Sequence, residues 1–250
     1  MTVFDHKNQR TLLSNTFNMA DIKTEDPTII ARSLLYVAIC LQQLPPNFDT
    51  SRVQIGSSTD ALMDKIISTV QGLITSDDEL VSTMEGLECL ILQGVFHING
   101  GSPRRAWMSF RRALNVAQLM GLHKSTDTSR RGGRNMWYQI EYADRYLALL
   151  LGLPAGSSDN EYGPNETFQN PDIDKDILFQ RKISTIAARI IQLKQSENTQ
   201  AYASTQSLDD SLESLAKEMP ASWWAVPTYL APDRTPEAAT QFDRLLLQIW

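Results

Sequence analysis

Two segments decide the fold of this chain. Residues 99–123 read N-G-G-S-P-R-R-A-W-M-S-F-R-R-A-L-N-V-A-Q-L-M-G-L-H, and residues 134–154 read R-N-M-W-Y-Q-I-E-Y-A-D-R-Y-L-A-L-L-L-G-L-P. Gly121 and Gly152 each suit the left-handed position that follows a helix, and a leucine follows each of them. The same ending in both segments predicts two helices of similar design.

The start of the first helix is also marked. Ser102 is a favourable N-cap residue, and Pro103 suits the first helical position because its missing N–H costs nothing there. The sequence therefore predicts helices at Ser102–Met120 and Arg134–Leu151. Because the connection through Gly100-Gly101 is short, we expect Ser76–Met120 to form an antiparallel helical hairpin.

The predicted helices are amphipathic. At about 100° per residue, one side of the first helix is apolar. Its members are Ala106, Phe110, Ala113, Leu114 and Ala117, with Trp107 at the edge. The other side is basic and is expected to face solvent; it carries Arg104, Arg105, Arg111 and Arg112.

An acidic residue, Asp144, falls within the apolar arc of the second helix. A buried carboxylate is costly unless it is paired and hydrogen-bonded, so we expect a structural ion pair with an arginine. The candidates are Arg104, Arg105 and Arg134, with Arg145 in the same group. The alternative is a ligand-binding or catalytic aspartate.

The motif residues in these two helices resemble the fungal-specific transcription factor domain, the middle homology region of fungal zinc binuclear cluster regulators. The matching positions include Arg105, Trp107, Gly121, His123, Trp137, Asp144, Arg145, Gly152 and Pro154. A later stretch, Leu208 to Trp224, is similar to the leucine-rich helix and P-x-x-W-W of that family. The resemblance covers roughly residues 25–250.

The resemblance implies a nuclear regulator of transcription that is not an enzyme. It also implies a zinc cluster that reads DNA, and such a cluster needs six cysteines. This chain has two, Cys40 and Cys89, which we expect to be buried free thiols. We therefore expect no cofactor here: zinc and DNA contact belong to an N-terminal module outside this sequence. The expected partners are a small-molecule effector or a co-regulator protein. The alternative is a helical-repeat interaction scaffold without DNA targeting.

Composition sets further bounds. The chain has 250 residues, of which 42% are hydrophobic, and its net charge of −6 argues against a generally nucleic-acid-binding surface. The charge is uneven, because residues 103–134 carry +7 and the rest −13. No apolar run reaches the ~18 residues that span a bilayer, so no membrane partner is expected.

Helical periodicity recurs along the whole chain, so we predict an all-α fold of stacked antiparallel hairpins. Residues 1–25 are expected to be a poorly ordered lead-in, and 26–250 one helical domain, incomplete at its C-terminus. Further helices are predicted to begin at Asp26 and to cover Ala61–Ile74, Ser76–Phe96, Asp176–Gln195 and Ser207–Met219, with a last one after Thr235-Pro236. A capping box of Ser76 and Glu79 should start the third of these.

The sequence gives little support for a metal site or a catalytic site. Asp209, Asp210 and Glu213 lie opposite a leucine stripe and are interpreted as a solvated face, not as metal ligands. The three histidines, His6, His97 and His123, lack ligand spacing. Trp223 and Trp224 are either a cap on the core or contacts for a partner or ligand.

Overall fold

The computed structural model describes residues 25–44, 48–49, 56, 58–124, 131–157, 175–195 and 201–224. Within these residues every regular element is a helix and no strand occurs, which confirms the all-α class. The chain divides into two compact units, Asn18–Asn198 and a second that joins Thr199–Trp250 to Met1–Phe17. The predicted boundary at residue 25 stays a prediction, because residues 1–24 lie outside the described part. So does the predicted helix after Thr235-Pro236.

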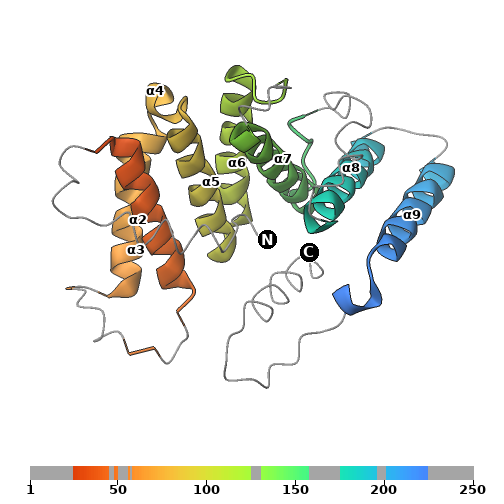
Figure 1. The fold of residues 1–250 in the computed structure, drawn as a ribbon, viewed down its shortest axis with the longest axis horizontal. Helices are drawn as coiled ribbons and strands as arrows, with labels where there is room; N and C mark the ends of the chain where they lie inside the picture. Colours follow the sequence, from red (N-terminus) through yellow and green to blue (C-terminus); the bar gives the residue numbers. More distant parts are fainter. Residues whose placement is uncertain are drawn as a thin grey trace. The chain divides into compact units, whose positions relative to one another are not determined.

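The larger unit contains seven described α-helices and one π-helical turn (Figure 1). They are α2 (Pro27–Gln42), α3 (Thr59–Val70), η2 (Gln71–Thr75), α4 (Asp78–Val81), α5 (Met84–Asn99), α6 (Pro103–Leu119), α7 (Arg131–Leu151) and α8 (Lys175–Gln195). Helix α2 packs on α3 and α5, and then α5 packs on α6, α6 on α7, and α7 on α8. The predicted contact between the helices before and after Gly100-Gly101 is present.

The core follows this order of packing. Each of the helices α2, α5, α6 and α7 contributes large side chains that are at most 2% exposed. They are Leu35, Leu87, Leu90, Ile91, Leu92, Phe110, Leu114, Trp137, Ile140 and Leu147. Helices α5 and α6 approach closely at Gly94, where a Cβ atom would lie 2.5 Å from Cε2 of Phe110. A glycine at this position lets the aromatic ring lie against the backbone of α5.

Three successive helices end in the same way. Gly101, Gly121 and Gly152 have φ values of 66°, 72° and 70°. After α6 the N–H of Leu122 donates to the Ala117 carbonyl at 3.0 Å, and after α7 the N–H of Leu153 donates to the Ala148 carbonyl at 2.8 Å. These 6→1 bonds define the Schellman motif, so the endings predicted at Gly121 and Gly152 are confirmed.

The helix starts are only partly as predicted. Asp26 caps α2, since its carboxylate accepts from the Thr28 N–H at 2.8 Å. Ser102 occupies the N-cap position of α6, but its side chain makes no capping bond. Helix α7 starts three residues before the predicted Arg134.

The predicted continuous helix from Ser76 to Phe96 is wrong, and so is its capping box. Asp77, not Ser76, caps the short α4, accepting from the Glu79 N–H at 2.9 Å. The chain then breaks, and Thr83 caps α5 by accepting from the Gly86 N–H at 3.0 Å. A Cβ atom on Gly86 would lie 1.9 Å from the Leu80 carbonyl oxygen, so this glycine makes the break sterically possible.

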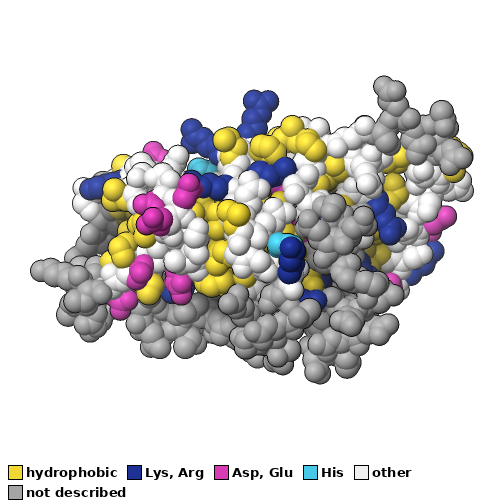
Figure 2. All heavy atoms as spheres, turned by 90° about the horizontal axis from the view of Figure 1, so that it is seen from above, with side chains coloured by type: hydrophobic (Ala, Val, Ile, Leu, Met, Phe, Trp, Pro, Cys, Tyr) yellow, Lys and Arg dark blue, Asp and Glu magenta, His cyan; other side chains and the backbone are white. Residues whose placement is uncertain are grey.

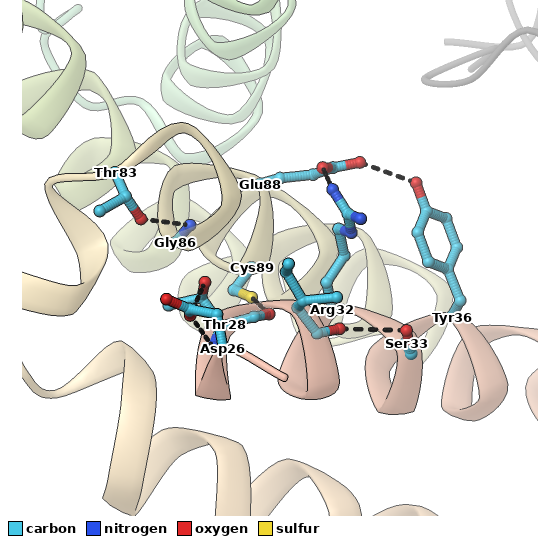
Figure 3. Close-up of polar contacts among 10 residues, drawn as sticks. Asp26, Thr28, Arg32, Ser33, Tyr36, Thr83, Gly86, Glu88 and Cys89 are labelled. Atoms are coloured by element: carbon cyan, nitrogen blue, oxygen red, sulfur yellow. Dashed lines mark hydrogen bonds and ion pairs between the residues drawn. The ribbon is translucent and has the colours of Figure 1, made fainter. Parts of the chain in front are cut away.

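Polar contacts join α2 to α5 (Figure 3). Arg32 and Tyr36 of α2 both reach Glu88 of α5, with an ion pair of 3.0 Å and a hydrogen bond of 2.9 Å. Beside them, the Cys89 thiol donates to the Thr28 carbonyl at 3.4 Å, and burial raises the pKa of Cys89 to about 12. Both cysteines are free, but Cys40 is exposed and the expectation that it is buried is wrong. Cys40 lies on the side of α2 that faces away from the core.

The described part of the smaller unit consists of α9 (Ala201–Glu218) and the 3-10 turn η5 (Ala221–Trp223). Helix α9 starts six residues before the predicted Ser207. No helix among the described residues has the length and apolar character needed to cross a membrane.

Candidate functional site

The carboxylate of Asp144 on α7 is fully buried and multiply hydrogen-bonded. Its Oδ1 accepts from Arg111 Nε at 2.7 Å, and its Oδ2 is 3.3 Å from Arg111 Nη2. Oδ2 also accepts from the Gly156 N–H at 2.8 Å. The two bonds from Arg111 form the bidentate fork that makes guanidinium–carboxylate pairs strong.

Arg111 links three parts of the molecule. Its Cζ lies 4.7 Å from the ring centroid of Trp107, one turn earlier on α6, where the guanidinium stacks on the indole. Its Nη2 donates to the Pro154 carbonyl at 2.7 Å. Arg111 therefore ties α6 to both α7 and the chain that leaves α7.

Residues 152–157 are held closely against α6 and α7. A Cβ atom on Gly156 would lie 2.4 Å from Leu114 Cδ2 and 2.9 Å from Arg111 Nε. Only a glycine allows the backbone to approach near enough for its N–H to reach Asp144.

A second buried ion pair lies next to the first. Arg145 and Glu141, one turn apart on α7, are 1% and 2% exposed, and Nη2 of the arginine is 2.8 Å from Oε1 of the glutamate. Ser157 donates to the same Oε1 at 2.7 Å. Nη1 of Arg145 is 3.5 Å from both the carbonyl and the hydroxyl of Ser184 on α8. This pair thus connects α7 to residues 152–157 and to α8.

We call these seven residues the buried polar network: Arg111, Glu141, Asp144, Arg145, Gly156, Ser157 and Ser184. Its two arginines balance its two acids. Burial raises the pKa of Asp144, although Arg111 and the Gly156 N–H act in the opposite direction. Burial and pairing thus act on the Asp144 carboxyl in opposite directions, and removing either member of the pair would leave a buried charge uncompensated.

The structure corrects the expected partner of Asp144. Arg104 and Arg105 are exposed on α6 and do not reach it. Arg134 donates to the Tyr138 hydroxyl at 3.2 Å, and Arg145 pairs with Glu141. The partner is Arg111, which the helical wheel assigned to the solvent-facing basic side. The long arginine side chain leaves the edge of that side, passes over Trp107 and reaches the seam, and only 22% of it stays exposed.

Sequence reasoning missed five members of the network: Arg111, Glu141, Gly156, Ser157 and Ser184. Two signals for them were present. Trp107 and Arg111 have the i, i+4 spacing that brings side chains together on a helix, and so do Glu141 and Arg145.

Other motif residues serve packing. His123 lies beside Trp137, with ring centroids 5.5 Å apart, where the end of α6 meets α7. Leu122 is 3% exposed, and its Cδ2 would lie 3.0 Å from a Cβ atom on Gly133. Gly121 and Gly152 end their helices. Of the motif residues, His123, Trp137 and Asp144 thus lie where α6 meets α7, whereas Arg105 is exposed.

Most of the remaining candidates belong to the smaller unit. Trp223 is 3% exposed and Trp224 41% exposed, and their rings meet edge to face at 4.6 Å. Asp209, Asp210 and Glu213 are exposed, and Glu213 pairs with Lys217 at 3.1 Å. No group of three or more His, Cys, Asp or Glu side chains suited to a metal ion occurs among the described residues, and His6 lies outside them.

Comparison with known proteins agrees with the motif. Residues 9–206 match the fungal specific transcription factor domain. The chain is 38% identical to the transcription factor sdnS of Sordaria araneosa over 94% of its own length, and 36% identical to the transcription factor eupR of a Phoma species over 84%. It is 32% identical to a dehydrocurvularin biosynthesis regulator of Alternaria cinerariae over 80%.

The chain spans 32%, 48% and 27% of the lengths of these three relatives. No solved structure matches it significantly. The family match covers most of the chain, and all three relatives are named as transcription factors or regulators. The chain therefore belongs to the family of the fungal-specific transcription factor domain.

Proposed function

We propose that this chain is the regulatory domain of a nuclear transcription factor, and that a zinc cluster elsewhere in the polypeptide supplies DNA targeting. The proposal is supported by the family match and by relatives that are two to three times longer than the matched region. In this proposal the domain itself holds no cofactor. Its partners are a small-molecule effector or a co-regulator protein.

One observation carries the regulatory part of the proposal: a single buried polar network joins α6, α7, residues 152–157 and α8. The bond from Arg111 to Asp144 crosses from α6 to α7, and the contact of Arg145 with Ser184 continues to α8. Charged groups without water must keep their partners, so the helices they join move together or the network breaks. A ligand or partner that favours one of two helix packings would then change the whole domain.

The charged members of the network are already engaged with one another. Arg111 and Asp144 form one pair, and Glu141 and Arg145 the other. A catalytic acid or base must reach a substrate, and these groups are turned towards the interior instead. Their arrangement suits the mechanical coupling of helices.

A fusion experiment tests this function. The full chain is joined to a DNA-binding module of known target, and transcription of a reporter with that target is measured in a fungal host. We expect a reporter output that differs from that of the module alone, and a change in that output when Arg111→Met disturbs the network. The matched control is Arg189→Met, at an exposed arginine of α8. An output equal to that of the module alone, at equal protein level, would contradict the proposal.

A further inference from the structure

The solvent-facing side of α6 carries an exposed apolar strip. Met108 is 67% exposed and Leu119 86% exposed. They are eleven residues apart, so they lie within about 20° of each other around the helix and about 16 Å apart along it. The exposed Asn115 lies between them on the same side. These two apolar side chains are aligned along the helix axis, and the opposite side of α6 is buried in the core. Together they form an exposed face on which a further helix could pack.

This face is bordered by positive charge. Helix α6 contains four arginines and no acidic residue. Two of the charges are engaged, because Arg111 pairs with Asp144 and Arg112 pairs with Asp78 at 2.8 Å. Arg104 and Arg105 are exposed, and neither has an ion-pair partner within the described ranges. They stand in the first turn of α6, where the helix dipole adds to their positive potential.

Charge is unevenly distributed on the face of the molecule that Figure 2 draws. Figure 2 shows several acidic side chains gathered on the left of the face seen from above, and Lys and Arg side chains nearer its middle, beside hydrophobic ones. Asp78, whose side chain is 94% exposed, borders the face at Arg112. The uncompensated charge is therefore at the Arg104 and Arg105 end, and the apolar strip runs from there towards Leu119.

We propose that this face of α6 is a docking site for an acidic amphipathic helix of a partner protein. Apolar side chains of that helix pack on Met108 and Leu119, and its carboxylates meet Arg104 and Arg105. Such a helix-on-helix contact needs anchors at helical spacing on one side and complementary charge at the border, and α6 offers both.

Charge and polarity argue against two other occupants. A second copy of α6 would bring four more arginines and no carboxylate to the contact. Nucleic acid would use the arginines but not the exposed Met108 and Leu119, because DNA binding is dominated by contacts to phosphates. The chain's net charge of −6 points the same way.

The test uses the full chain and two fluorescein-labelled peptides of about 18 residues, long enough to follow the strip. Both carry the same leucine seam; one is flanked by Glu and the other by Lys. Binding is measured by fluorescence anisotropy at low and high salt. We expect the Glu peptide to bind at least about tenfold more tightly than the Lys peptide, with an affinity that falls as salt rises.

Two pairs of substitutions locate the site. The double variant R104E/R105E should weaken binding of the Glu peptide by about tenfold or more and restore part of the binding of the Lys peptide. M108S/L119S should weaken binding of both peptides. The matched controls are Arg189→Glu, at an exposed arginine of α8, and Leu73→Ser, at a leucine that is 67% exposed as Met108 is. Neither control should change binding.

Four results would overturn the proposal. They are absence of binding by the Glu peptide, equal binding of the two peptides, unchanged affinity in both double variants, and equal loss in the controls. Two further assays test the other occupants. Sedimentation that shows self-association abolished by M108S/L119S would assign the face to a second copy. Duplex DNA binding abolished by R104E/R105E would assign it to nucleic acid.

Discussion

Replacing Arg111 with methionine tests the buried polar network most directly. The substitution keeps a long side chain over Trp107 but removes the guanidinium that faces Asp144. The carboxylate is 0% exposed and would keep only the Gly156 N–H as a donor. Breaking a fully buried pair costs about 3–5 kcal/mol, because it leaves an uncompensated charge. The Arg111 side chain is 22% exposed, so water can reach part of the vacated space, and we expect the lower end, about 3 kcal/mol.

This cost should be visible as a fall in the melting temperature. For a domain of this size 1 kcal/mol corresponds to about 2–4 °C, so Arg111→Met should lower Tm by about 6–12 °C. The assay is thermal unfolding followed by circular dichroism at neutral pH. Arg189→Met, at an exposed position on α8, is the control and should leave Tm almost unchanged.

A second substitution separates lost charge pairing from lost packing. Asp144→Asn keeps the shape of the side chain and an acceptor for the Gly156 N–H but removes the charge. In the Arg111→Met background it should recover part of the lost stability, because no unpaired carboxylate then stays buried. The reasoning is refuted if Arg111→Met has the same Tm as wild type, or if the double variant is less stable than Arg111→Met alone.

Three further predictions concern other positions. Burial and the nearby Arg105 lower the pKa of His97, so the unfolded chain takes up the proton first and the free energy of unfolding decreases as pH falls below about 6.5. In urea unfolding, His97→Gln should therefore lose less stability than wild type between about pH 7.5 and 5.5. Equal losses in the two proteins would contradict this. Gly94→Ala should lower the free energy of unfolding by about 1–3 kcal/mol, because the added Cβ would clash with the Phe110 ring. The change is measured as a shift of the urea midpoint, and an unchanged midpoint would show that the ring moves freely. Gly156→Ala should lower Tm in the same way, because its Cβ would lie 2.4 Å from Leu114 Cδ2; wild-type Tm in this variant would mean that the backbone can withdraw without loss.

Much of the helical framework could be predicted because its signals act within one turn of the chain. Asp26 caps α2 through an N–H two residues away, and Gly121 and Gly152 end their helices through bonds that span five residues. The family motif could be identified from the sequence for a related reason, since it includes these local devices. The break at Ser82-Thr83 was missed because it depends on the approach of the Leu80 backbone to Gly86, which helical periodicity does not report.

The sequence by itself determined that Asp144 faces the interior, because periodicity assigns a residue to a side of a helix. Only the tertiary structure decided which arginine meets it. Arg111 is 33 residues away along the chain, and four or more bonds separate its guanidinium from its Cα, so its position on the helical wheel did not fix where its charge would lie. The packing of Trp107 beneath the guanidinium and of Gly156 beside it fixed that position. Local chemistry thus specified the helices, and contacts between distant residues specified how their buried charges are paired.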